Sequence, residues 1–175
     1  MTGVQTCALP IFFGEEALLD GVEIDSQTFY ERLRGPGPLP RSSQPSVDLF
    51  QEAYERLSAD GSEIVSIHLS SKMSGTLNAA SVAREVVKET AHVDLIDSYQ
   101  VSLGLGLIVM EAALAAQAGK SLAEVVAATR RAMDRTGVFL VVDTLEFLRR
   151  GGRIGRASSL EIGRASCRER VCYPV

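Results

Sequence analysis

The stretch Glu63–Lys88, EIVSIHLSSKMSGTLNAASVAREVVK, joins three different local patterns. Its first part, 64–69, is a short apolar run typical of a buried strand. Its last part, 77–88, carries apolar residues at helical spacing and predicts a helix. Between them, Ser70–Thr76 contains four hydroxyl residues, one lysine and one glycine. The sequence therefore predicts a strand, a hydroxyl-rich turn and a helix in direct succession.

Further strands and helices are predicted on both sides of this stretch. Asp25 and Ser46 are suited to cap two helices that precede it. The elements predicted after it are a strand over Val93–Ile96, an apolar helix over Val101–Ala118, a helix capped by Ser121 and Glu124, and a strand over Val138–Val142. Short apolar strands separated by helices indicate an α/β fold built on a parallel sheet.

Three turns are predicted to converge on one edge of this sheet. They are Ser70–Thr76 after the first strand, Asp97–Ser98 after the second and Asp143–Thr144 after the third. Ligands of open parallel sheets bind beyond the carboxyl ends of the strands. We therefore expect the binding site at this edge.

The hydroxyl-rich turn has the chemistry of an anion cradle. A helix N-terminus offers unpaired N–H groups and the positive end of the helix dipole. Gly75 lacks a Cβ that would obstruct a ligand oxygen, and Ser74 and Thr76 can donate from their hydroxyls. Because Lys72 is the one cation of the turn, a carboxyl group fits better than a phosphate. Spacing alone leaves open the alternative that Ser74 or Thr76 merely caps the helix.

Composition excludes several classes of function. The chain has 18 basic and 22 acidic residues and a formal net charge of −4, without a basic face for nucleic acid. Val101–Ala118 is too polar to span a membrane because it contains Glu111 and Gln117, and a buried core helix is predicted instead. His68 and His92 lack partners at metal-ligand spacing, so no metal is expected. The cysteine-free middle of the chain agrees with a cytoplasmic protein.

The two ends of the chain differ from its middle. Residues 1–11 lack charge and a clear period, and residues 161–175 contain two of the three cysteines. Both ends resemble translated sequencing-adaptor read-through, although natural tails are the alternative. We therefore predict non-family flanks at 1–11 and 161–175 around a domain at 12–160.

Four motifs occur in a characteristic order. They are SSQPS (Ser42–Ser46), SIHLSSKMSGT (Ser66–Thr76), LIDS with SLGLG (Leu95–Gly106) and VVDTLEFLRRGGRIG (Val141–Gly155). Together they resemble the DegV family of bacterial fatty-acid-binding proteins. The resemblance implies the parallel-sheet N-terminal domain of a two-domain α/β fold, truncated at both ends.

The same resemblance carries expectations about function. It implies a protein that is not an enzyme, needs no cofactor, and binds one long-chain fatty acid for presentation to a separate fatty acid kinase. Family residues that hold the carboxyl group correspond to Ser42, where threonine is usual, and to Ser74, Gly75 and Thr76. Two alternatives stay open, namely a small-anion enzyme such as a sugar-phosphate isomerase and a truncated fragment without function. The scarcity of general bases near the turn argues against the enzyme.

Overall fold

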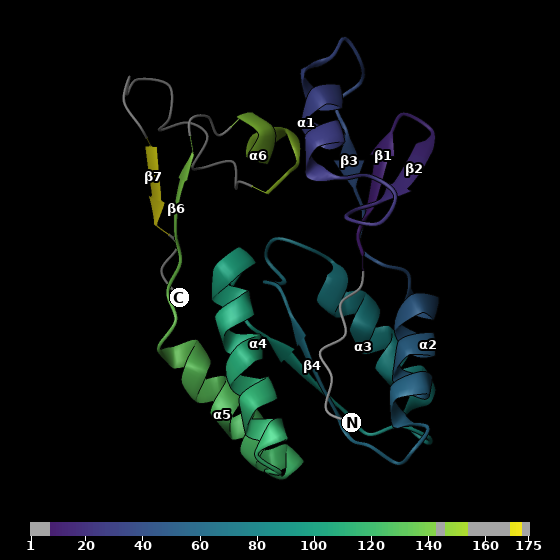
Figure 1. Cartoon of the computed structure of the whole chain (residues 1–175), viewed down its shortest axis with the longest axis vertical. Coiled ribbons are helices and arrows are strands. Elements are labelled where there is room, and N and C mark those ends of the chain that lie inside the picture. The colour runs from purple at the N-terminus through teal and green to yellow at the C-terminus, as the bar shows by residue number, and fades with distance from the viewer. Residues whose placement is uncertain (1–7, 143–145, 154–168, 173–175) are drawn as a thin grey trace. The chain divides into compact units, whose positions relative to one another are not determined.

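The computed structural model of the chain describes residues 8–142, 146–153 and 169–172 (Figure 1). These residues form two units, of which the first comprises the described residues of 1–66 and 74–96. The second comprises 67–73 and the described residues from 97 onward. The expected flank at 161–175 lies mostly outside the described residues, and the expected domain boundaries stay predictions.

The first unit contains three helices that begin where capping residues predict. They are α1 (Ser26–Arg34), α2 (Val47–Ser58) and α3 (Thr76–Val87). The Asp25 side chain accepts from the Thr28 N–H, and the Ser46 hydroxyl accepts from the Leu49 N–H. Both N-cap predictions are therefore confirmed, because each side chain satisfies an N–H group that the helix itself cannot pair.

The core of the first unit lies where α2 packs on α3. Phe50 and Tyr54 are one helical turn apart on α2, and both are buried. They pack with the small side chains Ala79, Ala80 and Ala83 of α3, which let the helix backbones approach closely. The Tyr54 hydroxyl is 2.9 Å from Ser66 Oγ, so its polar end is satisfied inside this packing.

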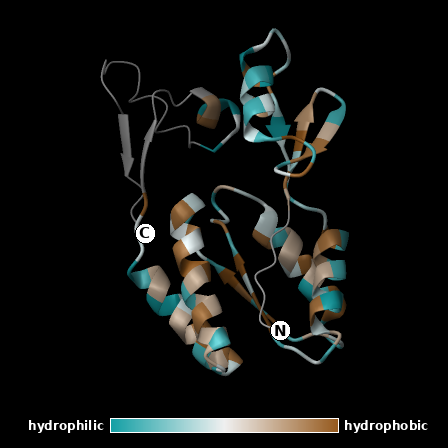
Figure 2. Cartoon of the chain, viewed as in Figure 1, coloured by the Kyte–Doolittle hydropathy of each residue, from teal (hydrophilic) through white to brown (hydrophobic). Residues whose placement is uncertain are grey.

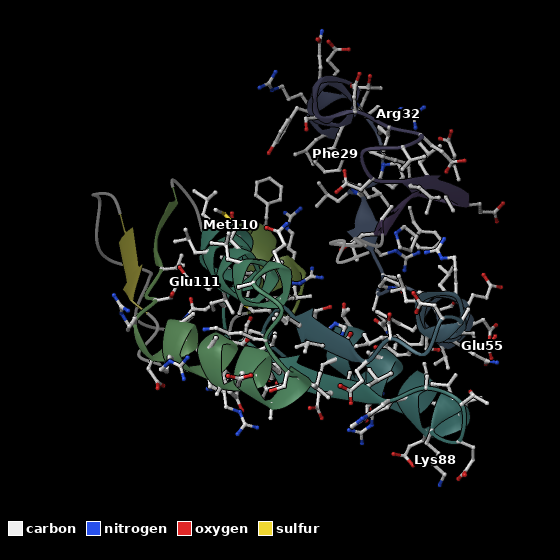
Figure 3. All side chains as sticks on the ribbon, turned by 60° about the horizontal axis from the view of Figure 1, so that its bottom comes forward. Phe29, Arg32, Glu55, Lys88, Met110 and Glu111 are labelled. Atoms are coloured by element: carbon white, nitrogen blue, oxygen red, sulfur yellow. The ribbon has the colours of Figure 1, made fainter. Side chains whose placement is uncertain are left out.

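A small antiparallel sheet in the first unit was not predicted from the sequence. Its strand order is β2 (Glu16–Leu19), β1 (Pro10–Phe13) and β3 (Arg41–Ser42). Phe29 of α1 makes an edge-on contact with Phe13, with ring centroids 6.0 Å apart. The Arg32 guanidinium lies over the Phe13 ring, and its Nη1 atom is 2.7 Å from Glu16 Oε2. Figure 3 labels Phe29 and Arg32 on α1.

Strands β4 (Ile64–His68) and β5 (Val93–Asp97) form the parallel pair that the sequence predicts. The Ile64 N–H donates to the His92 carbonyl, and the Ser98 N–H donates to the His68 carbonyl, so both strands run in the same direction. This parallel pair carries the hydroxyl-rich turn at the carboxyl end of β4. The α/β fold class is confirmed.

The third predicted strand has a different partner from the one expected. Strand β6 (Phe139–Val142) pairs antiparallel with β7 (Glu169–Cys172), and in the described part of the chain neither joins β4 or β5. An apolar run predicts a strand but does not encode which neighbour it pairs with. The predicted convergence of three parallel strands is therefore wrong, and Asp143–Thr144 lies outside the described residues.

The second unit is built on α4 (Ser102–Gln117) and α5 (Leu122–Asp134), followed by the short α6 (Glu146–Arg150). The predicted capping box is present, since the Ser121 N–H and hydroxyl both bind Glu124. Ile108 and Ala112 of α4 are buried, whereas Leu103 is 83% exposed on another face. Figure 2 shows hydrophobic residues along α4. The prediction of a buried core helix is thus correct for one face of α4.

Candidate functional site

The candidate site lies where the extended segment Arg41–Ser46 meets the N-terminus of α3. A Cβ placed on Gly75 would lie 3.2 Å from Cδ and Oε1 of Gln44 and 3.3 Å from its Nε2. The two motifs are about 30 residues apart in the chain. The fold brings SSQPS beside SGT, and both belong to the first unit.

The extended segment is held at several points. Ser42 pairs with Ile11 in the antiparallel sheet, and the Ser43 N–H donates to the Pro10 carbonyl at 3.1 Å. Pro45 is fully buried, and its ring disfavours helical conformation at the residue before it. The backbone around Gln44 is therefore fixed before any ligand binds.

Two hydroxyl groups of the turn form a pair at the start of α3. Ser74 Oγ is 2.8 Å from Thr76 Oγ1 and also accepts from the Thr76 N–H at 3.3 Å. Thr76 is buried and Ser74 is half-buried. One hydroxyl hydrogen is shared between the two oxygens, so the second can be donated to a ligand.

The backbone of the same turn supplies further donors. The N-cap of α3 is Gly75, which has no side chain, so the alternative that Thr76 merely caps the helix is wrong. For Ser74 this alternative accounts for one N–H group only, that of Thr76, which donates to the Ser74 hydroxyl. In the ranges that the structure describes, the Leu77 and Asn78 N–H groups have no hydrogen-bond partner. These N–H groups and the helix dipole favour an anion at this position.

The space beside Gly75 is filled by a side chain, whereas the sequence suggested that it is open. The sequence suggested that the missing Cβ leaves room for a ligand oxygen. Instead, the Gln44 carboxamide occupies that space. Gly75 has an ordinary φ of −77°, so close side-chain packing, rather than backbone conformation, accounts for glycine here.

Ser42 is placed on the same segment as Gln44 but on the strand β3. Its side chain is exposed. The structure thus brings Ser74, Gly75 and Thr76 together with Gln44, and Ser42 lies two residues before Gln44 in the chain. Ligand contacts of Ser42, Ser74, Gly75 and Thr76 stay predictions.

The turn after β5 has a structural role in the second unit. The Asp97 carboxylate accepts from the Ser71 N–H at 3.2 Å and from the Tyr99 N–H at 3.0 Å. The Ser98 hydroxyl donates to the His68 carbonyl at 2.7 Å. Asp97 and Ser98 therefore bind backbone groups of the turns that follow β4 and β5.

His68, at the end of β4, is buried and stays neutral. Burial lowers its pKa to about 4, and the nearby Asp97 opposes this effect. A neutral imidazole in such a place packs as part of the strand end and does not need a charged partner. Among the described residues, no group of three or more metal-ligating side chains is found.

The last motif also reaches the hydroxyl-rich turn. Arg153 of the GGRIG sequence donates from Nε to the Met73 carbonyl at 3.4 Å, within the second unit. Met73 directly precedes Ser74 in the chain. Arg153 therefore contacts the part of the turn that belongs to the second unit.

Sequence reasoning missed Gln44 as part of the site. The available signal was its position in SSQPS, flanked by a motif hydroxyl and by the proline that keeps the segment extended. Its contact partner Gly75 could not be inferred, because no local pattern encodes contacts between segments so far apart.

Comparison with known proteins shows the family and the fold of the chain. The family profile described as "Uncharacterised protein, DegV family" matches residues 1–164. The chain belongs to the DegV family. Its relatives include a DegV domain-containing protein of Clostridium perfringens, 38% identical over 161 residues, which cover 90% of this chain and 56% of that protein. The chain thus spans little more than half the length of this relative.

Solved structures of family members have the same fold. A DegV family protein from Thermus thermophilus, described by its fatty acid binding, has a TM-score of 0.87 and 29% identity, covering 99% of this chain and 61% of that one. DegV from Bacillus subtilis, described as a fatty acid binding protein, has a TM-score of 0.83 and 28% identity. The match covers 96% of this chain and 60% of that one. In the part of the chain that the structure describes, no helix is long and apolar enough to cross a membrane.

Proposed function

We propose that this chain binds a long-chain fatty acid and holds its carboxyl group with Ser42, Ser74, Gly75 and Thr76. The observation that carries the proposal is the Ser74–Thr76 hydroxyl pair at the N-terminus of α3, joined by a 2.8 Å contact. Family membership supports the choice of a fatty acid, because two relatives of similar fold are described as fatty acid binders.

The site chemistry suits a carboxyl group. The spare hydroxyl hydrogen of the Ser74–Thr76 pair donates to one carboxyl oxygen, and the Leu77 and Asn78 N–H groups favour negative charge on the other. A protonated carboxyl group also fits, because serine and threonine hydroxyls accept as well as donate. The site therefore needs no cation to bind its ligand.

The tail of the ligand supplies most of the affinity. Burying a methylene group contributes about 0.8 kcal/mol, so a tail of about 14 methylenes offers on the order of 11 kcal/mol before ordering costs. A hydrogen bond to a charged group contributes about 1.5–3 kcal/mol. The hydroxyl-rich turn thus sets the position of the carboxyl group rather than the overall affinity.

We further propose that the bound carboxyl group is presented to a separate fatty acid kinase. In this reaction a carboxylate oxygen attacks the γ-phosphorus of ATP, forming an acyl phosphate and releasing ADP. The kinase holds the nucleotide and performs the chemistry, so this protein acts as a carrier without catalytic residues of its own. The family resemblance of the four motifs supports this role.

Lipid extraction of the purified full-length protein tests fatty acid binding. We expect about one equivalent of long-chain fatty acid by mass spectrometry, since the extraction releases a ligand bound at one site. A matched sample of the Ser74→Ala, Thr76→Val double variant should retain less. Protein that takes up sugar phosphates but no fatty acid would support the small-anion enzyme instead.

A hydroxylamine trap tests presentation to the kinase. Incubating the loaded protein with a fatty acid kinase and ATP should yield the fatty hydroxamate, because hydroxylamine captures acyl phosphates. Free fatty acid at the same concentration, without the carrier, serves as the control. Equal yields with and without the carrier would refute the presentation role.

A further inference from the structure

Buried polar residues gather where the turns after β4 and β5 meet. Six polar residues are buried in the described part of the chain, and four of them lie at this junction within the second unit. They are His68, Ser70, Ser98 and Gln100. Among the described residues, no buried side-chain nitrogen or oxygen lacks a hydrogen-bond partner. Because a buried polar group is costly to leave unpaired, these bonds hold the junction in one arrangement.

Gln100 joins this junction to the end of α5. Its side-chain Nε2 donates to the Thr136 carbonyl at 3.2 Å, two residues after α5 ends at Asp134. Its backbone N–H donates to Ser98 Oγ at 3.1 Å, and the Ser98 hydroxyl donates to the His68 carbonyl. Gln100 is only 5% exposed, so water competes little for these bonds. The residue is therefore held through both its backbone and its side chain.

The carbonyl of Gln100 holds the first residue of the hydroxyl-rich turn. The Ser70 N–H donates to the Gln100 carbonyl at 3.0 Å, and the Met73 N–H donates to the Ser70 carbonyl at 2.9 Å. Met73 directly precedes Ser74 in the chain. A continuous series of hydrogen bonds thus runs from the end of α5 through Gln100 and Ser70 to the residue before Ser74.

We propose that Gln100 is a positioning residue for the ligand site, which sets the place of the Ser74 hydroxyl through this series without touching the ligand. This inference rests on the proposed function, because it concerns the carboxyl group that Ser74 binds there. Hydrogen bonds depend on distance and angle, so a displaced hydroxyl binds a carboxyl oxygen less well. Loss of the bond between Gln100 and Thr136 should therefore weaken acid binding, although the side chains that touch the ligand are unchanged.

Titration of the full-length protein with dodecanoic acid tests the proposal in Gln100→Met, which keeps an unbranched side chain without its polar atoms. We expect about fivefold weaker binding, since one hydrogen bond that positions the turn is lost. Thr129→Val is the matched control, because Thr129 is also buried and its hydroxyl donates to the Val125 carbonyl at 2.8 Å. This bond lies outside the series, so the affinity should be unchanged. No change in Gln100→Met, or an equal loss in Thr129→Val, would overturn the inference.

A double-variant cycle separates positioning from general destabilisation. If Gln100 acts through Ser74, Gln100→Met should have little further effect on acid binding in a Ser74→Ala background. The same fold-loss in both backgrounds would contradict action through Ser74.

Amide hydrogen exchange, followed by NMR, reports on the turn without a ligand. Gln100→Met should speed exchange at the Ser70 and Met73 amides, whereas Thr129→Val should not. Unaltered exchange at both amides would refute the positioning role. If the unaltered protein binds dodecanoic acid and Gln100→Met binds it equally well, the inference fails while fatty acid binding stands. If the unaltered protein binds no dodecanoic acid, the proposed function fails, and the ligand role of Gln100 fails with it.

Discussion

In the proposed function, the orientation of the ligand depends on two oxygen atoms at the start of α3. Ser74 Oγ contacts both Thr76 Oγ1 and the Thr76 N–H, so it fixes the hydroxyl pair as well as contributing to it. We expect Ser74→Ala to weaken fatty acid binding about tenfold, the loss of one hydrogen bond to a carboxyl group. Titration of the full-length protein with dodecanoic acid measures this change.

A conservative variant separates chemistry from packing at the same position. Ser74→Thr keeps the hydroxyl and should bind within about threefold of the unaltered protein, since an added methyl at a half-buried site costs little. An unchanged dissociation constant in Ser74→Ala would remove Ser74 from the site.

His68 makes stability depend on pH. Its folded pKa is lowered to about 4 by burial, whereas in the unfolded chain it takes the ordinary value of 6.5. Between these values the unfolded state binds a proton that the folded state does not, so stability is lost as the pH falls from 6.5 toward 4. The loss by pH 4 is roughly 3 kcal/mol.

Urea unfolding between pH 7.5 and 4.5 measures this dependence. His68→Gln should flatten it, because the titrating group is gone. His92→Gln is the control, since His92 is exposed and paired with Glu63 at 2.9 Å. Identical slopes for His68→Gln and the unaltered protein would exclude His68 as the source.

Two glycines of α4 have opposite environments and yield opposite predictions. A Cβ on Gly104 would overlap Val138 Cγ2 and lie 3.3 Å from Gln100 Oε1. A Cβ on Gly106 would meet no other described atom within 4 Å beyond its chain neighbours and the backbone of its own helix. Gly104→Ala should destabilise the protein by about 1–3 kcal/mol through overpacking. Gly106→Ala should stabilise it by up to about 1 kcal/mol, because alanine favours a helix.

Thermal unfolding of the two variants checks this pair. We expect a lower midpoint for Gly104→Ala and a higher one for Gly106→Ala, with the same helical circular dichroism in both. A higher midpoint for Gly104→Ala would mean that α4 does not pack against Val138 as the structure describes.

Elements with a local signal were predictable, and elements defined by a partner were not. The N-caps Asp25, Ser46 and Ser121 mark helix starts because a cap bonds an N–H group only a few residues away. Strand β3 has only two residues and exists through its pairing with β1, so no periodic pattern predicts it. For the same reason the partner of β6 could not be predicted.

The candidate site also combines residues that a local pattern predicts with a residue that depends on a distant contact. The hydroxyl-rich turn was predictable because Ser74, Gly75 and Thr76 are adjacent in the chain. The place of Gln44 was not, since its contact with Gly75 joins segments about 30 residues apart. Tertiary contacts of this kind depend on the path of the whole chain between them.

The whole chain spans little over half the length of the relatives that it matches. The Thermus thermophilus structure exceeds the matched region, since the chain covers 61% of it. The tail of a bound fatty acid needs more apolar surface than the turn offers, because the methylenes carry most of the affinity. Binding should therefore be measured on the full-length protein.

A crystal structure of the full-length protein purified with its lipid would show where the carboxyl group binds. We predict one fatty acid with a carboxyl oxygen within hydrogen-bond distance of the Ser74 and Thr76 hydroxyls, at the N-terminus of α3. A fatty acid whose carboxyl group lies away from this turn, or a turn that holds another anion while a lipid is bound elsewhere, would contradict the account.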